Sequence, residues 1–216
     1  MTDRKNARLL ALGLLLIFSS TVAVLLARQF SLGPVRPAPD FRVFGPAGAP
    51  VQIYEYTDFA CPACRHAAGK LDEMMKVFGG GIQVHFKHYP LLNIHPWSLH
   101  AAAYADCAGA QGKFKEYAGL LFEGQEKWGP ARVEAGEPKE FAEYAGALGL
   151  DWQKMLACAD DPETLRNLKL DIAEADLKGV NATPTFFING KRAVGSGQLI
   201  DQARKFENIL RKAAKP

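Results

Sequence analysis

The sequence lacks the features that mark nucleic-acid-binding proteins and small disulfide scaffolds. Its 216 residues carry 26 Lys and Arg against 23 Asp and Glu, a net charge of only +3. So small an excess offers no basic surface, and no nucleic-acid partner is expected. Only four cysteines are present, and a chain of this length can bury a core without cross-links. There is no internal repeat or low-complexity tract.

One long apolar run is present, at the N-terminus. Leu9 to Ala27 carry no charge, and about 20 apolar residues suffice to cross a bilayer as a helix. Three basic residues precede the run, so the positive-inside rule leaves the short N-terminus in the cytoplasm. We expect residues 1–27 to be a single-pass signal anchor in the inner (cytoplasmic) membrane, with the rest of the chain on the periplasmic or extracytoplasmic side. A cleaved signal peptide is the alternative, although Leu25 stands where a small residue is wanted.

Residues 28–40 contain three prolines and predict an extended linker, so that the folded domain spans residues 41–216. Val51–Tyr56 is predicted as a strand from its β-branched and aromatic residues. Pro62–Phe78 is predicted as a helix, and the alternating Ile82–His88 as a second strand. This order indicates a parallel pair of strands joined by a crossover helix.

The middle of the chain, about residues 91–178, is predicted to be a helical insertion, with helices at Pro96–Gln111, Lys113–Phe122, Pro138–Leu148, Asp151–Ala159 and Pro162–Lys178. Strand signals return at Thr185–Ile188, with an Asn-Gly turn and a short strand at Arg192–Val194. A last helix over Gln198–Lys212 closes the chain. The sequence therefore predicts an α/β fold in which a helical insertion separates a βαβ half from a ββα half.

Cys61 and Cys64 lie directly after a predicted strand, at the start of a helix. Unpaired N–H groups and the helix dipole favour an anion there, so the Cys61 thiolate should be stabilised. Cys64, one turn deeper, should be less exposed, which makes Cys61 the attacking sulfur and Cys64 the resolving one. The alternative, half of a zinc site, lacks a second pair of ligands in a finger arrangement, and no metal is expected.

The sequence here resembles the DsbA-like, thioredoxin-fold thiol–disulfide oxidoreductases, in particular their membrane-anchored bacterial branch. Tyr54–Cys64 (YEYTDFACPAC), Gln111–Tyr117 (QGKFKEY) and Val180–Gly190 (VNATPTFFING) carry the resemblance, which extends over about residues 41–212. It implies a thioredoxin fold with a helical insertion and no cofactor beyond the redox-active Cys61–Cys64 disulfide. It further implies exported unfolded or cysteine-containing proteins as substrates, and a membrane quinone-linked thiol oxidase as the re-oxidant.

The resemblance also assigns roles to individual residues. Thr183-Pro184 matches the family's cis-proline loop, which binds the extended backbone of the substrate. The dipeptide Pro62-Ala63 departs from the Pro-His pair of the best-known oxidase, which puts the strength of the oxidant in doubt.

Glu55 falls on the same face of its strand as apolar residues, where a carboxylate is costly unless it is paired or protonated. In the family, an acidic residue at this position lies beneath the resolving cysteine and exchanges protons with it. The alternative is a Glu55 that points to solvent. Lys87 on the neighbouring strand is a weak candidate for its partner.

Cys107 and Cys158 lie on two predicted helices of the insertion. We expect a structural disulfide between them, with two buried free thiols as the alternative. Neither begins a helix, so a second redox pair is not expected.

Three functions remain in competition. The first is a thiol oxidase that donates its disulfide to exported proteins. The second is a membrane-tethered reductase or isomerase. Isomerases of this fold usually carry a dimerisation domain, and there is no room for one before Asp40. We therefore expect a monomer. The third is a copper-binding or chaperone module that uses the same two thiols.

Overall fold

The computed structural model describes residues 13–22, 35–130, 133 and 136–213. Within them, a five-stranded sheet has the order β1-β3-β2-β4-β5. The strands are β1 (Val43–Phe44), β2 (Val51–Thr57), β3 (Ile82–His88), β4 (Thr185–Ile188) and β5 (Lys191–Val194). Strands β2 and β3 run parallel, and the other neighbours are antiparallel. This mixed sheet with its helices confirms the predicted α/β thioredoxin fold.

The helices and strands follow the predicted pattern closely, with three differences. They are α2 (Pro62–Phe78), α3 (Ser98–Ala110), α4 (Phe114–Glu123), α5 (Gln125–Trp128), α6 (Glu140–Ala147), α7 (Trp152–Ala159), α8 (Pro162–Leu177), α9 (Gly195–Lys205) and α10 (Glu207–Ala213). The short α5 and the two-residue strand β1 were not predicted. The last helix is divided at Phe206, which is the C-cap of α9.

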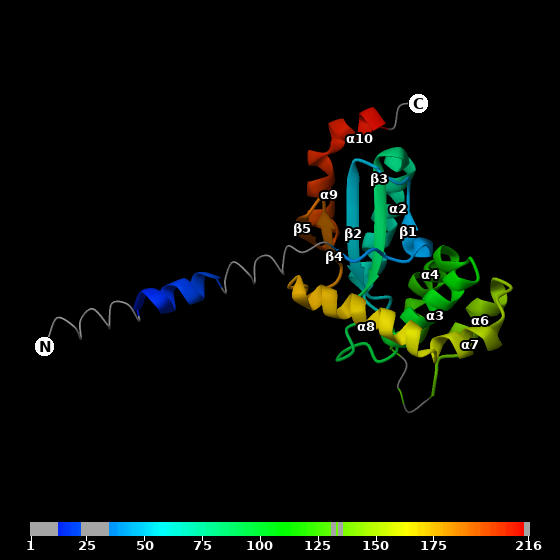
Figure 1. Ribbon diagram of the computed structural model, residues 1–216. Helices are drawn as coiled ribbons and strands as arrows, with labels where there is room; N and C mark the ends of the chain where they lie inside the picture. Colours follow the sequence, from blue (N-terminus) through cyan, green and yellow to red (C-terminus); the bar gives the residue numbers. More distant parts are fainter. Residues whose placement is uncertain (1–12, 23–34, 131–132, 134–135, 214–216) are drawn as a thin grey trace, which may run out of the picture.

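The two faces of the sheet bury different kinds of side chain. On one face, apolar residues such as Val51 and Ile53 pack with Leu71 of α2 and Leu199 of α9. On the other face, α8 covers the sheet, and the Tyr56 hydroxyl donates to Glu174 of that helix. Figure 1 shows the insertion helices α3, α4, α6 and α7 gathered to one side of the sheet. The first face is therefore the apolar one, and α2 lies directly on it.

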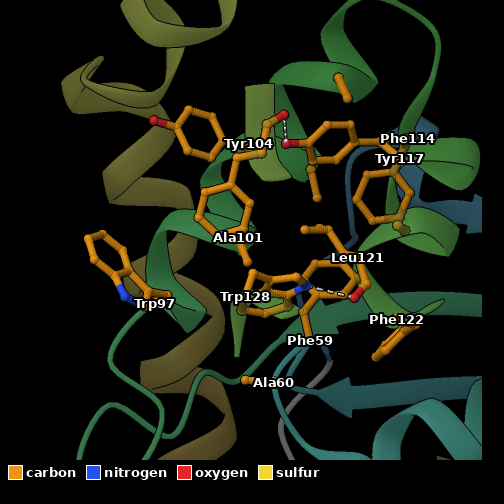
Figure 2. Close-up of a cluster of buried hydrophobic side chains, with 14 of the residues drawn as sticks. Phe59, Ala60, Trp97, Ala101, Tyr104, Phe114, Tyr117, Leu121, Phe122 and Trp128 are labelled. Carbon is orange, nitrogen blue, oxygen red and sulfur yellow. Dashed lines mark hydrogen bonds between the residues drawn. The ribbon is translucent and has the colours of Figure 1, made fainter. Parts of the chain in front are cut away.

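The insertion has an aromatic core that continues to the active-site helix. Trp128, Tyr117 and Phe141 are fully buried in it, and Trp128 Nε1 donates to the Leu121 carbonyl (Figure 2). Phe59, two residues before Cys61, packs into the same core. The insertion therefore supports the loop that leads into α2.

The predicted N-terminal anchor falls largely outside the described residues. Residues 13–22 are helical, and the remainder of Leu9–Ala27 is not described. Across the residues that the structure describes, no helix combines the length and apolarity needed to cross a membrane. The end of the predicted linker packs on the domain: Arg36 Nη2 lies 2.7 Å from Asp171 Oδ1 of α8, and Ala38 is buried.

Candidate active site

Cys61 occupies the position just before the first residue of α2. Its N–H donates to the Asp58 carbonyl at 3.1 Å, which closes a tight turn after β2. Its carbonyl accepts from the N–H groups of Cys64 and Arg65, as an N-cap carbonyl does. Pro62 and Ala63 are exposed and carry no side-chain donor. In this dipeptide only backbone groups are therefore available to interact with the Cys61 sulfur.

The two thiols are free, and their environments differ. A hydrogen bond from the Cys64 thiol, the Thr183 side chain and the N–H groups of Cys64 and Ala63 together lower the pKa of Cys61 from 9.0 to about 5, against the opposing effect of burial. Cys64 is completely buried, and this burial and the neighbouring Cys61 sulfur raise its pKa. At neutral pH the pair therefore holds one thiolate, on Cys61, and one thiol, on Cys64.

Glu55 lies on the apolar face of β2, flanked in register by Phe86 and Phe186. It is 3% exposed, and burial raises its pKa from 4.5 to about 8, although the Thr57 side chain partly opposes this. The Thr57 side chain also lowers the pKa of Cys64, so it lies near both groups. Glu55 Oε1 has no hydrogen-bond partner in the described part of the chain. The carboxyl is thus protonated near neutral pH and lies on the Cys64 side of the sheet.

A pocket of about 110 Å³ reaches Glu55 from the surface between the sheet, α2 and α4. Its walls are mainly apolar, and include Phe86 and Phe114. Asp72 and Lys115 also line it and form an ion pair at 3.4 Å. The buried carboxyl therefore faces a space large enough to admit water.

Lys87, the weak candidate for a partner of Glu55, does not pair with it. Lys87 is opposite Tyr56 in the register and so lies on the other face of the sheet. Its ammonium group contacts Asp171 and Glu174 of α8, both at 3.2 Å. Glu55 is opposite Phe86 in the register. Because side chains alternate between faces along a strand, Lys87, the next residue, points to the face opposite to Glu55.

The peptide bond between Thr183 and Pro184 is cis. The Thr183 carbonyl lies 3.5 Å from the Cys61 sulfur, which can donate a hydrogen bond to it only in the protonated form. The loop that precedes β4 thus meets the start of α2 although 122 residues separate the two in sequence. This contact places Thr183 and Pro184 beside Cys61, while Glu55 and Cys64 share the Thr57 side chain as a neighbour.

Cys107 and Cys158 are joined by a disulfide. The bond links α3 to α7, across a sequence separation of 51 residues. Cys107 is buried within α3, and Cys158 lies near the C-terminal end of α7. Elsewhere among the described residues, no group of three or more His, Cys, Asp or Glu is placed to hold a metal ion.

Sequence reasoning missed Asp58, which is buried beside the two cysteines. Its carboxylate accepts hydrogen bonds from the N–H groups of Ala60 and Leu91 and from the Ser98 hydroxyl. His95 Nδ1 lies 2.7 Å from Asp58 Oδ2. The Asp58 N–H itself points to the Cys64 sulfur at 3.5 Å. Its position could have indicated this role, because Asp58 is the one carboxylate in the turn between a buried strand and the helix that begins after Cys61.

Comparisons with known proteins agree with this geometry. The family model described as thioredoxin matches residues 38–209. Among solved structures, alpha-DsbA1 from Wolbachia pipientis superposes with a TM-score of 0.69 and 21% identity, over 83% of this chain and 95% of that one. DsbA2 from Pseudomonas aeruginosa gives a TM-score of 0.61 and 26% identity, over 77% and 94%. These neighbours confirm the resemblance to DsbA-type proteins, and neither addresses a membrane-anchored branch.

Curated relatives are of a different kind. The Na(+)/H(+) antiporter NhaA of Herminiimonas arsenicoxydans is 34% identical over 163 residues, which make up 76% of this chain and 24% of the antiporter. The NhaA 1 antiporter of Salinispora arenicola is 37% identical over 163 residues, again 76% and 24%. The chain therefore spans about a quarter of the length of the curated relatives that it matches.

Proposed function

The chain belongs to the thioredoxin family, and from that membership we propose that it is an extracytoplasmic thiol–disulfide oxidoreductase which donates the Cys61–Cys64 disulfide to exported proteins. The observation that carries the proposal is the asymmetry of the pair. Four groups around Cys61 lower its pKa to about 5, whereas Cys64 is completely buried with a raised pKa. A stabilised thiolate favours the reduced form, and a pair that prefers to be reduced is an oxidant.

The exchange proceeds in two displacements. A substrate thiolate attacks Cys61 Sγ of the oxidised pair, and the Cys61–Cys64 bond breaks with its electrons on Cys64. A second substrate thiolate then attacks the substrate sulfur of the mixed disulfide and expels Cys61 as a stabilised thiolate. The substrate loses two electrons and two protons; one proton goes to Cys64 and the other to solvent. Return to the disulfide requires an acceptor, for which we propose a membrane quinone-linked thiol oxidase.

Two neighbours of the pair take part in this scheme. Glu55 is protonated near neutral pH because its pKa is about 8, so it can supply the proton that Cys64 takes up. The pocket at Glu55 connects the carboxyl to the surface and lets it recover the proton. Thr183 and Pro184 border Cys61 and are proposed to bind the substrate backbone.

The proposed compartment rests on the second cysteine pair. A disulfide between Cys107 and Cys158 persists in an oxidising environment and is rare in the cytosol. We therefore propose that residues 1–27 anchor or export the chain, with the domain on the outer side of the inner membrane. Because the antiporters match this chain over only a quarter of their length, ion transport is not proposed for it.

The reduction potential tests the direction of electron flow. Equilibration of the purified protein with glutathione should give a value between those of protein disulfide isomerase, roughly −180 mV, and DsbA, roughly −120 mV. A value near that of thioredoxin, roughly −270 mV, would identify a reductase instead. The copper content of the same sample tests the metal-binding alternative, because a copper-binding module would carry the metal on its two reduced thiols.

A further inference from the structure

The last part of the predicted linker is fixed to helix α8. Arg36 Nη2 donates to the Asn167 carbonyl at 3.2 Å and lies 2.7 Å from Asp171 Oδ1, and both partners belong to α8. Ala38, two residues further on, is buried. Figure 1 shows this part of the chain crossing the sheet beside α8. Residues 36–38 therefore belong to the folded domain, and the chain joins the domain at α8.

Only a short stretch of chain separates this attachment from the apolar N-terminal run. Ala27, the last residue of the run, and Arg36 are nine positions apart, and we call the residues between them the tether. A fully extended chain spans at most about 3.5 Å per residue, which gives the tether a reach of roughly 30 Å. A domain of this size is roughly 40 Å across. With the apolar run in a bilayer, the side of the domain opposite α8 therefore cannot reach the membrane.

Helix α8 presents a row of apolar side chains on its outer face. The buried residues of the helix face the interior of the domain. On the outer face Leu170 is 39% exposed and Leu177 is 64% exposed, and Ala173 between them is also exposed. Spacings of three and four residues place the three side chains in one row along the helix. Single exposed leucines are ordinary on protein surfaces, so the tether and the nearby charges have to decide what this row contacts.

Basic residues surround the C-terminal half of this row. Lys169 is exposed on the helix, and Lys178 follows its last turn. Arg192 is held nearby by a hydrogen bond to the loop that follows α8. The exposed Asp176 accepts a hydrogen bond from a tyrosine hydroxyl, and the other exposed carboxylates lie at the N-terminal end of the helix, around its N-cap Asp161. The C-terminal half of α8 thus combines apolar side chains with net positive charge, a combination that binds anionic lipid surfaces.

We propose that the outer face of the C-terminal half of α8 rests on the anionic surface of the bilayer that holds the N-terminal run, with Leu170 and Leu177 among the lipid head groups. A short tether gives an effective concentration in the millimolar range, so a weak contact is enough to orient the domain. The inference rests on the anchoring part of the proposed function.

This orientation has a consequence for the active site. The chain continues from α8 into the Thr183-Pro184 loop, whose Thr183 carbonyl lies 3.5 Å from the Cys61 sulfur. A domain that rests on α8 therefore presents Cys61 close to the bilayer, within reach of the membrane-bound re-oxidant proposed above.

Photo-crosslinking to lipid tests the contact. The full-length protein is reconstituted in vesicles of phosphatidylglycerol and phosphatidylcholine, with benzoylphenylalanine in place of Leu177. The matched position is Val77, which is 62% exposed on α2, at the opposite face of the sheet. After irradiation, mass spectrometry should find about tenfold more lipid adduct at position 177 than at position 77, because the tether holds only α8 against the bilayer. In phosphatidylcholine alone the yield at position 177 should fall about threefold, since the attraction of the basic residues is lost.

A second variant tests the row without changing the labelled position. Lys169→Glu/Leu170→Ser should lower the yield at position 177 about fivefold, because it removes both a positive charge and apolar area from the contact. The control is Lys76→Glu/Val77→Ser, the same change at an exposed Lys and apolar pair of α2, which should leave the yield as it is.

Equal yields at positions 177 and 77, or a yield that Lys169→Glu/Leu170→Ser does not lower, overturn the inference. Adducts with a second copy of the chain in place of lipid assign the row to a dimer interface and overturn it as well. A mass that shows residues 1–27 removed from the protein in its own membrane eliminates the tether and has the same result. Equilibration with glutathione tests the oxidoreductase activity separately, and its failure with lipid labelling intact would overturn that activity alone.

Discussion

The molecule holds two pairs of cysteines whose surroundings differ. Cys61 stands at the N-terminus of α2, where backbone N–H groups and the Cys64 thiol stabilise its anion. Cys107 lies within α3 and Cys158 near the C-terminal end of α7, where the helix dipole disfavours an anion. One pair is free and borders a loop that can meet a substrate; the other is bonded between packed helices. Position relative to the helix ends, rather than the thiol group itself, separates a reactive pair from a structural one.

The largest expected effect comes from the reactive pair. Cys61→Ser should abolish oxidation of reduced peptides and catalysed reduction of insulin, because no other thiol lies at a helix start. Cys64→Ser should instead accumulate mixed disulfides with substrates, since the resolving thiol is gone. Turnover is followed spectroscopically, and the mixed disulfides by mass spectrometry. The double variant Cys107→Ser/Cys158→Ser is the control and should remain active; normal turnover by Cys61→Ser would falsify the assignment.

Removal of the structural pair should act on stability. The bond closes a loop across 51 residues, and the chain-entropy relation gives a cost of roughly 4 kcal/mol for its loss. For a domain of this size, that corresponds to a fall in Tm of roughly 10 °C. Melting of Cys107→Ser/Cys158→Ser beside the wild type measures it. The glutathione equilibrium of Cys61 and Cys64 should stay the same, and a large shift in it would mean that the two pairs are coupled.

Much of this contrast was predictable from the sequence, because local rules decide it. A strand followed by Cys-x-x-Cys and a helix places Cys61 at a helix start, and Pro62–Phe78 was predicted with its observed bounds. The break at Phe206 and the two-residue strand β1 were not, since both depend on packing rather than on periodicity.

Contacts between residues that are far apart in the sequence are the main features that could not be predicted. Alternation along β3 indicates which residues share a face, but it does not name what covers that face. Lys87 contacts Asp171, 84 residues further along the chain, and His95 contacts Asp58, 37 residues away. The buried position of Glu55, by contrast, could be predicted, because an acidic residue among apolar residues of a strand is conspicuous in the sequence.

The pH dependence of the reactive pair gives an effect of intermediate size. The pKa of Cys61 is lowered from 9.0 to about 5 in the folded, reduced protein. This contributes stability that is fully present above pH 9 and is lost as the pH falls to 5. The oxidised protein has no thiolate and lacks this contribution, so reduction should raise the Tm by several degrees at pH 9 and by little at pH 5.

Calorimetry of both redox forms at pH 5, 7 and 9 measures the difference. The burial of Glu55 affects both forms and largely cancels. Alkylation of Cys61 by iodoacetamide provides an independent check, with a midpoint near pH 5. A difference in Tm that is constant across this range, or an oxidised form that melts higher, would contradict the stabilised thiolate and favour a reductase.

The smallest expected change in rate belongs to Glu55→Gln, and it distinguishes a proton-exchanging carboxyl from a merely buried one. Burial raises its pKa from 4.5 to about 8, so between these values the unfolded state releases a proton that the folded state keeps. Glu55 therefore destabilises the fold increasingly as the pH rises from 4.5 to 8, and Glu55→Gln should remove this dependence.

In the resolving step, ionised Glu55 accepts the proton of Cys64 as that thiol attacks a mixed disulfide, and the rate of the wild type should rise through about pH 8. Glu55→Gln should lose this rise and be about tenfold slower at pH 8.5, which is less than the roughly hundredfold lower limit usual for general acid–base catalysis. Stopped-flow release of a peptide from its mixed disulfide with Cys61 measures the step. Glu73→Gln, an exposed position of α2 that is not among the groups shifting the pKa of Glu55, is the control. A variant that loses the dependence of stability on pH but keeps the rate profile would show that Glu55 is buried near Cys64 without exchanging its proton.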